Sequence, residues 1–256
     1  MLQIPVEVTT LPTQPVFPSK TIASIDGIRA WWTSHVEDMR LNTDGRQTIR
    51  PVVGTVPLLQ AGDAFSFPEV TINKKKRRPA LNDKNGNKFW TAPLALEAGW
   101  NSYVCAVQLE DFLESYEAAV VKVATGAILI YPFRGASATN GACVSWLAGT
   151  AGTETRIIET GALGANVPVY VTIAHNTATG AVKAAFNGGT VLSAATSPAA
   201  LTSDLTCSIE FGRRNASNPF NGRLLNFGHV VGDVLATEAS RVKLRSYMNA
   251  LYGIPA

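Results

Sequence analysis

The stretch Phe220-Asn221-Gly222-Arg223-Leu224-Leu225-Asn226-Phe227, with the residues that follow it to Tyr252-Gly253-Ile254, decides the fold predicted for this chain. The first part has the composition of a β-strand. After Leu235-Ala236-Thr237-Glu238 comes an amphipathic segment whose apolar side chains recur at the helical period of about 3.6 residues. These side chains are Leu244, Tyr247, Met248, Leu251 and Tyr252. We therefore expect a sheet that is closed by one C-terminal helix.

Both ends of this helix carry suitable residues. Thr237 suits the N-cap, and Glu238 places a negative charge at the positive end of the helix dipole. Gly253 stands where a left-handed C-cap is expected, and Pro255 prevents continuation. The pattern predicts one long helix over residues 237–252. Taken alone, it is equally typical of an ordinary surface helix.

The rest of the chain has the pattern of about a dozen short strands separated by Gly, Asn and Pro turns. Strands that do not alternate with helices indicate antiparallel sheets, and two stacked sheets are the simplest closure. No internal repeat is visible, which argues against a propeller or solenoid. We predict an all-β fold: an antiparallel jelly-roll β-sandwich with one C-terminal α-helix, occupying residues 21–256 as a single domain.

The composition is that of a folded protein. Of the 256 residues, 46% are apolar and 16% are charged, and the formal net charge of +3 is too small to indicate nucleic-acid binding. No apolar stretch approaches the ~18 residues of a membrane span, and the N-terminus lacks the features of a signal peptide. Cys105, Cys143 and Cys207 are odd in number and lie in apolar runs, so we expect buried free thiols in a protein made in a reducing cytoplasm.

Residues 1–20 form a separate segment, which four prolines keep extended. We predict an N-terminal arm that docks on a neighbouring subunit, because its side chains are too apolar for a solvated tail; a disordered tail is the alternative. The partner-binding side chains expected in it are Leu2, Ile4, Val6, Val16 and Phe17.

Several segments resemble, in their order and spacing, a known family. They are Trp31-Trp32, Arg78 to Leu81, Gly86 to Phe89, Tyr103 to Leu109, Val169 to Ile173, Gly180 to Gly188, Ile209 to Gly212, Phe220 to Leu224 and Tyr247 to Ile254. The set is similar to a concanavalin A-like lectin/glucanase domain of the laminin-G-like type found in bacteriophage virion proteins. The resemblance spans residues 22–254 and implies a sugar-binding, adhesive or structural role, with some glycosidases among the relatives.

No catalytic or metal-binding residues are predicted. The resemblance implies that enzymes of this kind carry Glu-x-Asp-x-Glu on one strand, and a retaining mechanism needs two adjacent carboxyl groups. The nearest acidic cluster, Glu110-Asp111-Phe112-Leu113-Glu114 with Glu117, has the spacing of a solvated turn or short helix. Nucleophile motifs are absent. The three histidines, which have no partner at metal-ligand spacing, are His35, His175 and His229.

One polar stretch leaves a calcium site open as an alternative to a plain turn. Relatives bind calcium through Asp, Asn and backbone oxygens, but the spacing here does not match an EF-hand loop. We expect no cofactor. The oxygen-bearing side chains are Asn82, Asp83, Asn85 and Asn87, with Asp44 elsewhere.

One basic run is a second candidate for partner binding. Five like charges repel, so the pattern predicts an exposed and mobile segment unless a partner neutralises it. That partner is an acidic surface of another virion protein or an anionic cell-surface polysaccharide. Nucleic acid is not expected, since no stacking aromatics are interleaved, and a solvated loop is the alternative. The run is Lys74, Lys75, Lys76, Arg77 and Arg78.

Sugar-stacking side chains are sought among Trp31, Trp32, Trp90, Trp100 and Trp146. Adjacent Trp31 and Trp32 must point to opposite faces of a strand. One is then expected in the core, and the other is either covered by the N-terminal arm or exposed to bind a ligand.

These observations predict a non-enzymatic structural protein of a phage virion, either a head decoration protein or a tail-associated module. It would be attached through contacts with capsid or tail subunits, with a homo-oligomer as an option and no membrane partner. The alternative is a carbohydrate-binding adhesion module that recognises a host-surface glycan, and a glycosidase is the third hypothesis.

Overall fold

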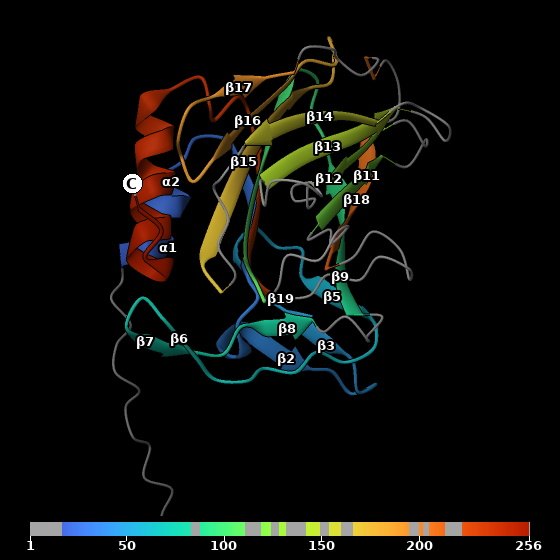
Figure 1. The fold of residues 1–256 in the computed structure, drawn as a ribbon. Helices are drawn as coiled ribbons and strands as arrows, with labels where there is room; N and C mark the ends of the chain where they lie inside the picture. The colour runs from blue at the N-terminus through green and yellow to red at the C-terminus, as the bar shows by residue number, and fades with distance from the viewer. Residues whose placement is uncertain are drawn as a thin grey trace, which may run out of the picture.

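The fold is built of antiparallel strands in two large sheets, with helices on one side, as the sequence predicted. Figure 1 shows three layers: a helical layer, a first sheet and a second sheet. In the described part of the chain, no helix is long and apolar enough to cross a membrane. The computed structural model describes residues 17–82, 88–110, 119–123, 128–131, 142–148, 154–159, 166–194, 200–201, 205–212 and 222–255.

The first sheet carries helices on one face and the second sheet on the other. Its central strands are therefore buried along almost their whole length. Even polar residues of these strands, such as Asn101 and His229, are buried. In order, its strands are β17 (Leu192–Ser193), β16 (Val182–Phe186), β15 (Pro168–Asn176), β10 (Trp100–Leu109), β19 (Gly222–Val231), β1 (Ile28–Thr33) and β4 (Pro51–Val53), and β8 (Ala80–Asn82) also pairs with β19.

The second sheet packs its inner face against the first, and the main core lies between them. Large aromatic rings fill this core; for example, Phe65 and Trp90 stack with their centroids 4.5 Å apart. In order, its strands are β14 (Glu154–Glu159), β13 (Ala142–Ala148), β12 (Ile128–Tyr131), β11 (Ala119–Val123), β18 (Thr206–Phe211), β9 (Lys88–Ala95), β5 (Leu58–Gly62), β3 (Gln47–Ile49) and β2 (Met39–Leu41).

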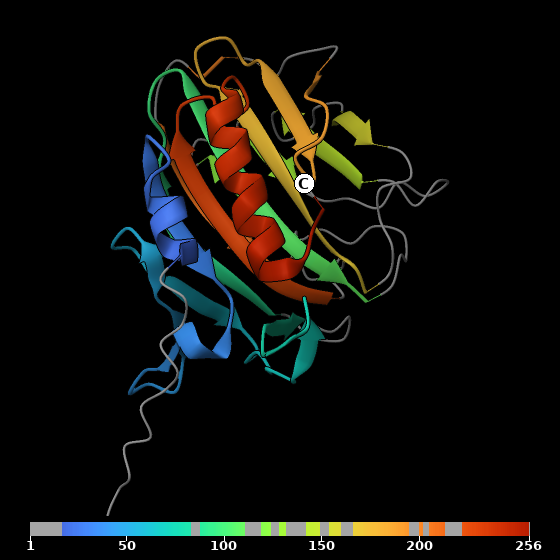
Figure 2. The ribbon, with the colours of Figure 1, turned by 90° about the vertical axis from the view of Figure 1, so that its left-hand side faces the viewer.

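The predicted C-terminal helix is α2 (Glu238–Tyr252), and Figure 2 shows it lying across the outer face of the first sheet. Its apolar stripe is buried there in a second core cluster, as the periodicity required. Gly253 ends the helix in the left-handed conformation, with φ of 69°. Thr237 occupies the N-cap, but its side chain makes no capping hydrogen bond.

Residues 17–20 differ from the extended arm that the prolines predicted. Helix α1 spans Phe17–Ala23. Pro18 lies in its first turn, where a proline is tolerated. Ile22 and Ile25 are buried in the same cluster as α2. Of the other predicted arm contacts, Leu2, Ile4, Val6 and Val16 lie outside the described residues.

The basic run also differs from the prediction of a mobile segment. Lys75–Arg77 form β7, which pairs with β6 (Val70–Ile72) in a hairpin. The turn consists of Asn73 and Lys74, with φ of 49° and 59°. The Asn73 amide donates hydrogen bonds of 3.0 Å to the carbonyls of Asn249 and Ala250. The hairpin is thereby tied to the end of α2, where the Asn249 carbonyl also accepts the Gly253 N–H at 2.9 Å.

Candidate functional site

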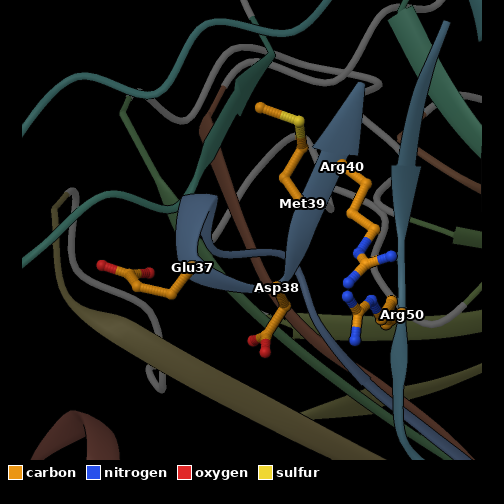
Figure 3. Close-up of a pocket in the computed structure, with 5 residues that line it drawn as sticks. All are labelled: Glu37, Asp38, Met39, Arg40 and Arg50. Atoms are coloured by element: carbon orange, nitrogen blue, oxygen red, sulfur yellow. The ribbon is translucent and has the colours of Figure 1, made fainter. Parts of the chain in front are cut away.

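A small hollow lies where the 3-10 turn η1 (Val36–Asp38) leads into β2, at the edge of the second sheet (Figure 3). Its volume is about 140 Å³. Pockets that enclose a drug-sized ligand have roughly 300–1,000 Å³, so this one suits a single small group or one end of a longer ligand. The hollow is lined by Glu37, Asp38, Met39, Arg40 and Arg50.

The register of one hairpin places these side chains together. The turn between β2 and β3 is closed by the Asn42 N–H, which donates to the Arg46 carbonyl at 2.8 Å. In the ladder that follows, Arg40 lies opposite Thr48. The Arg50 N–H donates to the Asp38 carbonyl at 3.1 Å, which sets Arg50 beside Asp38. Residues that face one another, and residues two positions apart on a strand, present their side chains on the same face, so Arg40 and Arg50 share one face of the hairpin.

The turn η1 is fixed from behind by the residues that follow the basic hairpin. The Val36 N–H donates to the Arg78 carbonyl at 2.9 Å, and His35 forms an isolated β-bridge with Pro79. One wall of the hollow therefore rests on a firm backbone contact. Arg78, at the end of the basic run, makes this contact through its main-chain carbonyl.

Asp38 is held toward the protein interior. Its carboxylate accepts a hydrogen bond from the Thr33 hydroxyl, which is buried. Burial is the main cause that raises the pKa of Asp38 above its ordinary value; the Thr33 hydrogen bond opposes this rise, and the negative charge of Glu37 adds to it. Asp38 therefore holds its proton more readily than an exposed aspartate would.

Behind the hollow lies a buried histidine. Burial, helped by the positive charge of Arg77, lowers the pKa of His35 to about 3. The centroid of the His35 ring lies 6.0 Å from that of the Tyr252 ring. The Arg77 guanidinium lies over the same Tyr252 ring, 5.8 Å from its centroid. His35 is thus a neutral core residue at pH 7, in contact with the end of α2.

The side chains of the hollow can bind polar groups but are not arranged as a pair of catalytic carboxyls. In Figure 3 the guanidinium groups of Arg40 and Arg50 lie next to one another on one side, whereas the carboxyl groups of Glu37 and Asp38 point in different directions. Carboxylates accept hydrogen bonds and guanidinium groups donate them. A ligand with hydroxyl and anionic groups fits this combination.

The predicted sugar-stacking tryptophans do not face solvent. Trp31 and Trp32 are each 0% exposed, and they point to opposite faces of β1 as predicted. Trp32 lies in the main core, where its indole N–H donates to the Val56 carbonyl at 2.9 Å. Trp31 is covered by α2 through Tyr247, and the prediction that the N-terminal arm covers it needs correction. Neither ring is open to a sugar.

Trp100 is half-buried, whereas Trp31, Trp32 and Trp90 are fully buried. The Lys183 ammonium lies 4.4 Å from its ring centroid and is held there by Asp233 at 2.7 Å. One face of the ring is therefore occupied by a cation–π contact. Trp90 is fully buried, and the side chain of Trp146 lies outside the described residues.

The basic side chains of the hairpin have separate roles. Lys76 pairs with Glu69 at 2.8 Å, and Arg77 lies over Tyr252. Lys74 and Lys75 remain exposed on the hairpin. Of the five basic residues, Arg77 is half-buried and the other four, including Arg78, are exposed.

Among the described residues, the remaining candidates from the sequence do not form a metal-binding cluster. His175 and His229 are buried, and no group of three or more metal-ligating side chains is found in the described residues. Glu110 pairs with Arg223 at 2.9 Å; Asp111, Glu114 and Glu117 lie outside the described part of the chain. So do Asp83, Asn85 and Asn87 of the calcium alternative, while Asn82 ends β8 and Asp44 pairs with Arg46.

Sequence reasoning missed the hollow because residues 34–50 show no long alternating pattern. A usable signal was present: Asp44-Gly45 is a turn dipeptide, and Gly45 has φ of 80°. A hairpin centred there sets Arg40 opposite Thr48 and Arg50 opposite Asp38. The charges would then fall on one face of an edge ribbon.

Comparisons with known proteins support the fold. No family model matches the chain, and no curated protein matches it in sequence. Among solved structures, it is similar to domain 4 of AbnA, a GH43 extracellular arabinanase from Geobacillus stearothermophilus solved with arabinotriose. The TM-score is 0.56 at 12% identity, over 85% of this chain and 97% of that one.

Two further neighbours are longer proteins, of which this chain matches little more than half. One is the botulinum neurotoxin type C structure titled for its interaction with two ganglioside molecules, with a TM-score of 0.53 and 11% identity over 88% of this chain and 52% of that one. The other is a GH54 α-L-arabinofuranosidase, with a TM-score of 0.53 and 12% identity over 88% and 60%. These likenesses show a β-sandwich of the jelly-roll type found in lectin-like and glycosidase-like domains.

Proposed function

We propose that this protein is a non-catalytic glycan-binding module and that the hollow beside η1 holds one sugar unit. The observation that carries the proposal is the set of residues that line this hollow of about 140 Å³: the adjacent arginines Arg40 and Arg50, and the acidic residues Glu37 and Asp38. Sugars present hydroxyl groups that both donate and accept, so they can use both kinds of side chain at once.

The structural neighbours favour this function over a purely structural role. A domain with a similar fold is described in complex with arabinotriose, and another neighbour is described as interacting with ganglioside molecules. Fold likeness alone does not carry a ligand to this chain. It makes a glycan the first class of ligand to test in a polar hollow.

The geometry argues for binding rather than hydrolysis. Glycoside hydrolysis uses two carboxyl groups on either side of the scissile bond, about 5–10 Å apart. Glu37 and Asp38 are sequence neighbours whose carboxyl groups point in different directions, and the Thr33 hydroxyl holds Asp38 inward. We therefore propose that the protein binds glycans and releases them without hydrolysing a glycosidic bond.

A glycan array with the full chain tests the proposal. We expect binding to at least one glycan class, weakened by Glu37→Gln and unaffected by the matched control Glu69→Gln, an exposed glutamate that pairs with Lys76 away from the hollow. Release of reducing ends from the bound glycan would contradict the non-catalytic part. Absence of binding to every glycan would contradict the function itself.

A structural protein of a phage virion, attached through protein–protein contacts, is the second candidate. Its support is the apolar composition of the N-terminal residues, Leu2, Ile4, Val6 and Val16. Such an attachment is compatible with glycan binding by the sandwich. Quantitative mass spectrometry of purified particles tests it: a decoration protein should be present in many copies, an adhesin in few, and absence from particles would exclude both.

A further inference from the structure

Arg40 and Arg50 differ from most other arginines of the described residues because neither makes an ion pair, a property that they share with Arg77 and Arg78. No hydrogen bond or ion pair to either guanidinium is found across the described residues. By contrast, five other arginines each contact a carboxylate: Arg29, Arg46, Arg223, Arg241 and Arg245. The two unpaired side chains are exposed and line the same hollow.

The hairpin register brings these two positive charges to one face of an edge ribbon. Arg50 sits beside Asp38, and Arg40 is two positions further along the neighbouring strand. Figure 3 shows their guanidinium groups next to one another. The two guanidinium groups are diagonal neighbours across the ribbon, within reach of one another for side chains of this length, so a single anion can contact both.

The carboxyl groups at the hollow do not supply this anion. Asp38 is bonded to Thr33, and the charge that acts on its pKa is that of Glu37. Glu37 is exposed and points away from the two arginines in Figure 3. The two adjacent guanidinium groups of Arg40 and Arg50 therefore remain available to a ligand from solution.

The donor geometry indicates the class of ligand. A guanidinium is a planar fork that binds a carboxylate through two parallel hydrogen bonds. A glycan, the class of ligand proposed above, brings hydroxyl groups on a small ring. The volume of about 140 Å³ limits the ligand to one small unit. A carboxylate and several hydroxyls on one small ring describe a sugar acid.

We infer that the hollow binds a carboxylated sugar unit of an acidic glycan, with the guanidinium groups of Arg40 and Arg50 holding the carboxylate. This inference rests on the proposed glycan-binding function and specifies its ligand. It assigns the specificity to two residues that are exposed and whose replacement leaves the core intact.

Calorimetric titration of the full chain with trigalacturonic acid, and with neutral galactotriose, tests the inference. We expect the acidic trimer to bind more tightly, and more weakly as NaCl is raised. In Arg40→Gln with Arg50→Gln its affinity should fall by about tenfold or more, the range for lost hydrogen bonds between charged groups. The matched control Arg46→Gln removes an arginine of the same hairpin that already pairs with Asp44, and should bind like the parent. Unchanged melting temperatures establish that all variants are folded.

The other outcomes separate the two claims. Equal binding of both trimers, with no effect of the arginine replacements, would overturn the acidic class while leaving glycan binding in place. Binding of tricarballylate, a carboxylate without sugar, as tightly as trigalacturonic acid would overturn the sugar. If neither trimer binds and the glycan array is also blank, the inference and the proposed function both fail.

Discussion

The indole N–H of Trp31 donates a hydrogen bond of 3.0 Å to the hydroxyl of Tyr247, although 216 residues separate the two in sequence. Their rings meet edge to face, with centroids 5.4 Å apart. Both side chains are buried between the first sheet and α2. This contact joins the helix to the sheet and gives the first prediction a defined target.

Tyr247→Phe should lower the free energy of unfolding by about 1–3 kcal/mol, because it leaves the buried indole N–H without an acceptor. Tyr103→Phe is the matched control, since the buried Tyr103 hydroxyl has no hydrogen-bond partner among the described residues. Its removal should be neutral or stabilising. Urea unfolding measures both; equal losses in the two variants would show that the Trp31 contact adds nothing.

Gly228 should not accept a side chain. A Cβ built there would lie 2.1 Å from Cε3 of the Trp31 ring. We expect Gly228→Ala to cost about 1–3 kcal/mol or more, as overpacking in cores does. Combining it with Trp31→Phe, which removes the overlapping ring, should cost less than the sum of the single changes. Strict additivity in this double-mutant cycle would place the cause elsewhere.

The Asn73 side chain should stabilise α2 through its two bonds to the helix carbonyls. Asn73→Gly keeps the positive φ of the turn but loses these bonds, and we expect a loss of about 1 kcal/mol. Lys74→Gly is the control, because it makes the same backbone change at the neighbouring position with φ of 59°. The thermal unfolding midpoints of the two variants should differ; a common midpoint would argue against the cap.

Stability should fall as the pH is lowered from about 6.5 toward 4. Burial lowers the pKa of His175 and of His229 to about 4, so between these values the unfolded chain binds more protons than the folded one. Each such histidine costs about 1.4 kcal/mol per pH unit in this range. Asp38, whose pKa is raised, acts in the opposite direction.

Urea unfolding at pH 7, 6 and 5 measures this dependence. His175→Leu should flatten the slope by close to one proton, because the buried His175 ring has no hydrogen-bond partner in the described part of the chain. If His175→Leu leaves the pH dependence of the free energy of unfolding unchanged, His175 does not take up a proton when the protein unfolds.

The thiols of Cys105 and Cys207 should resist alkylation in the folded protein. Both are free and buried, and burial raises the pKa of Cys207 to about 12. Since the thiolate is the reactive form, native labelling should be slow and should accelerate in denaturant. Mass spectrometry of iodoacetamide-treated protein shows this, and rapid native labelling of Cys105 would contradict the buried strand. The side chain of Cys143 lies outside the described residues.

The sequence predicted the fold class and the last helix well because their signals are local. The apolar spacing from Leu244 to Tyr252 and the glycine at position 253 suffice to define α2. Strand order was not predictable, since the pairing of β19 with β1 joins residues almost 200 positions apart and leaves no periodic trace.

The candidate site was less accessible from sequence for two reasons. The basic run carries no sequence signal for a hairpin, because its turn, Asn73 and Lys74, adopts positive φ without a glycine. The hollow depends on cross-strand register between Asp38 and Arg50, which propensity does not report. The exposed-tryptophan hypothesis was wrong because the outer face of β1 lies under α2.

The position of β19 has a consequence for how the protein is made. This strand, residues 222–231, inserts between β10 and β1 in the middle of the first sheet. A nascent chain that ends before residue 222 therefore carries two strands whose inner edges have no partner, and such edges promote association with other chains. Folding of the first sheet cannot be completed before residues 222–231 have been synthesised. Until then, the inner edges of β10 and β1 stay open to association with other chains.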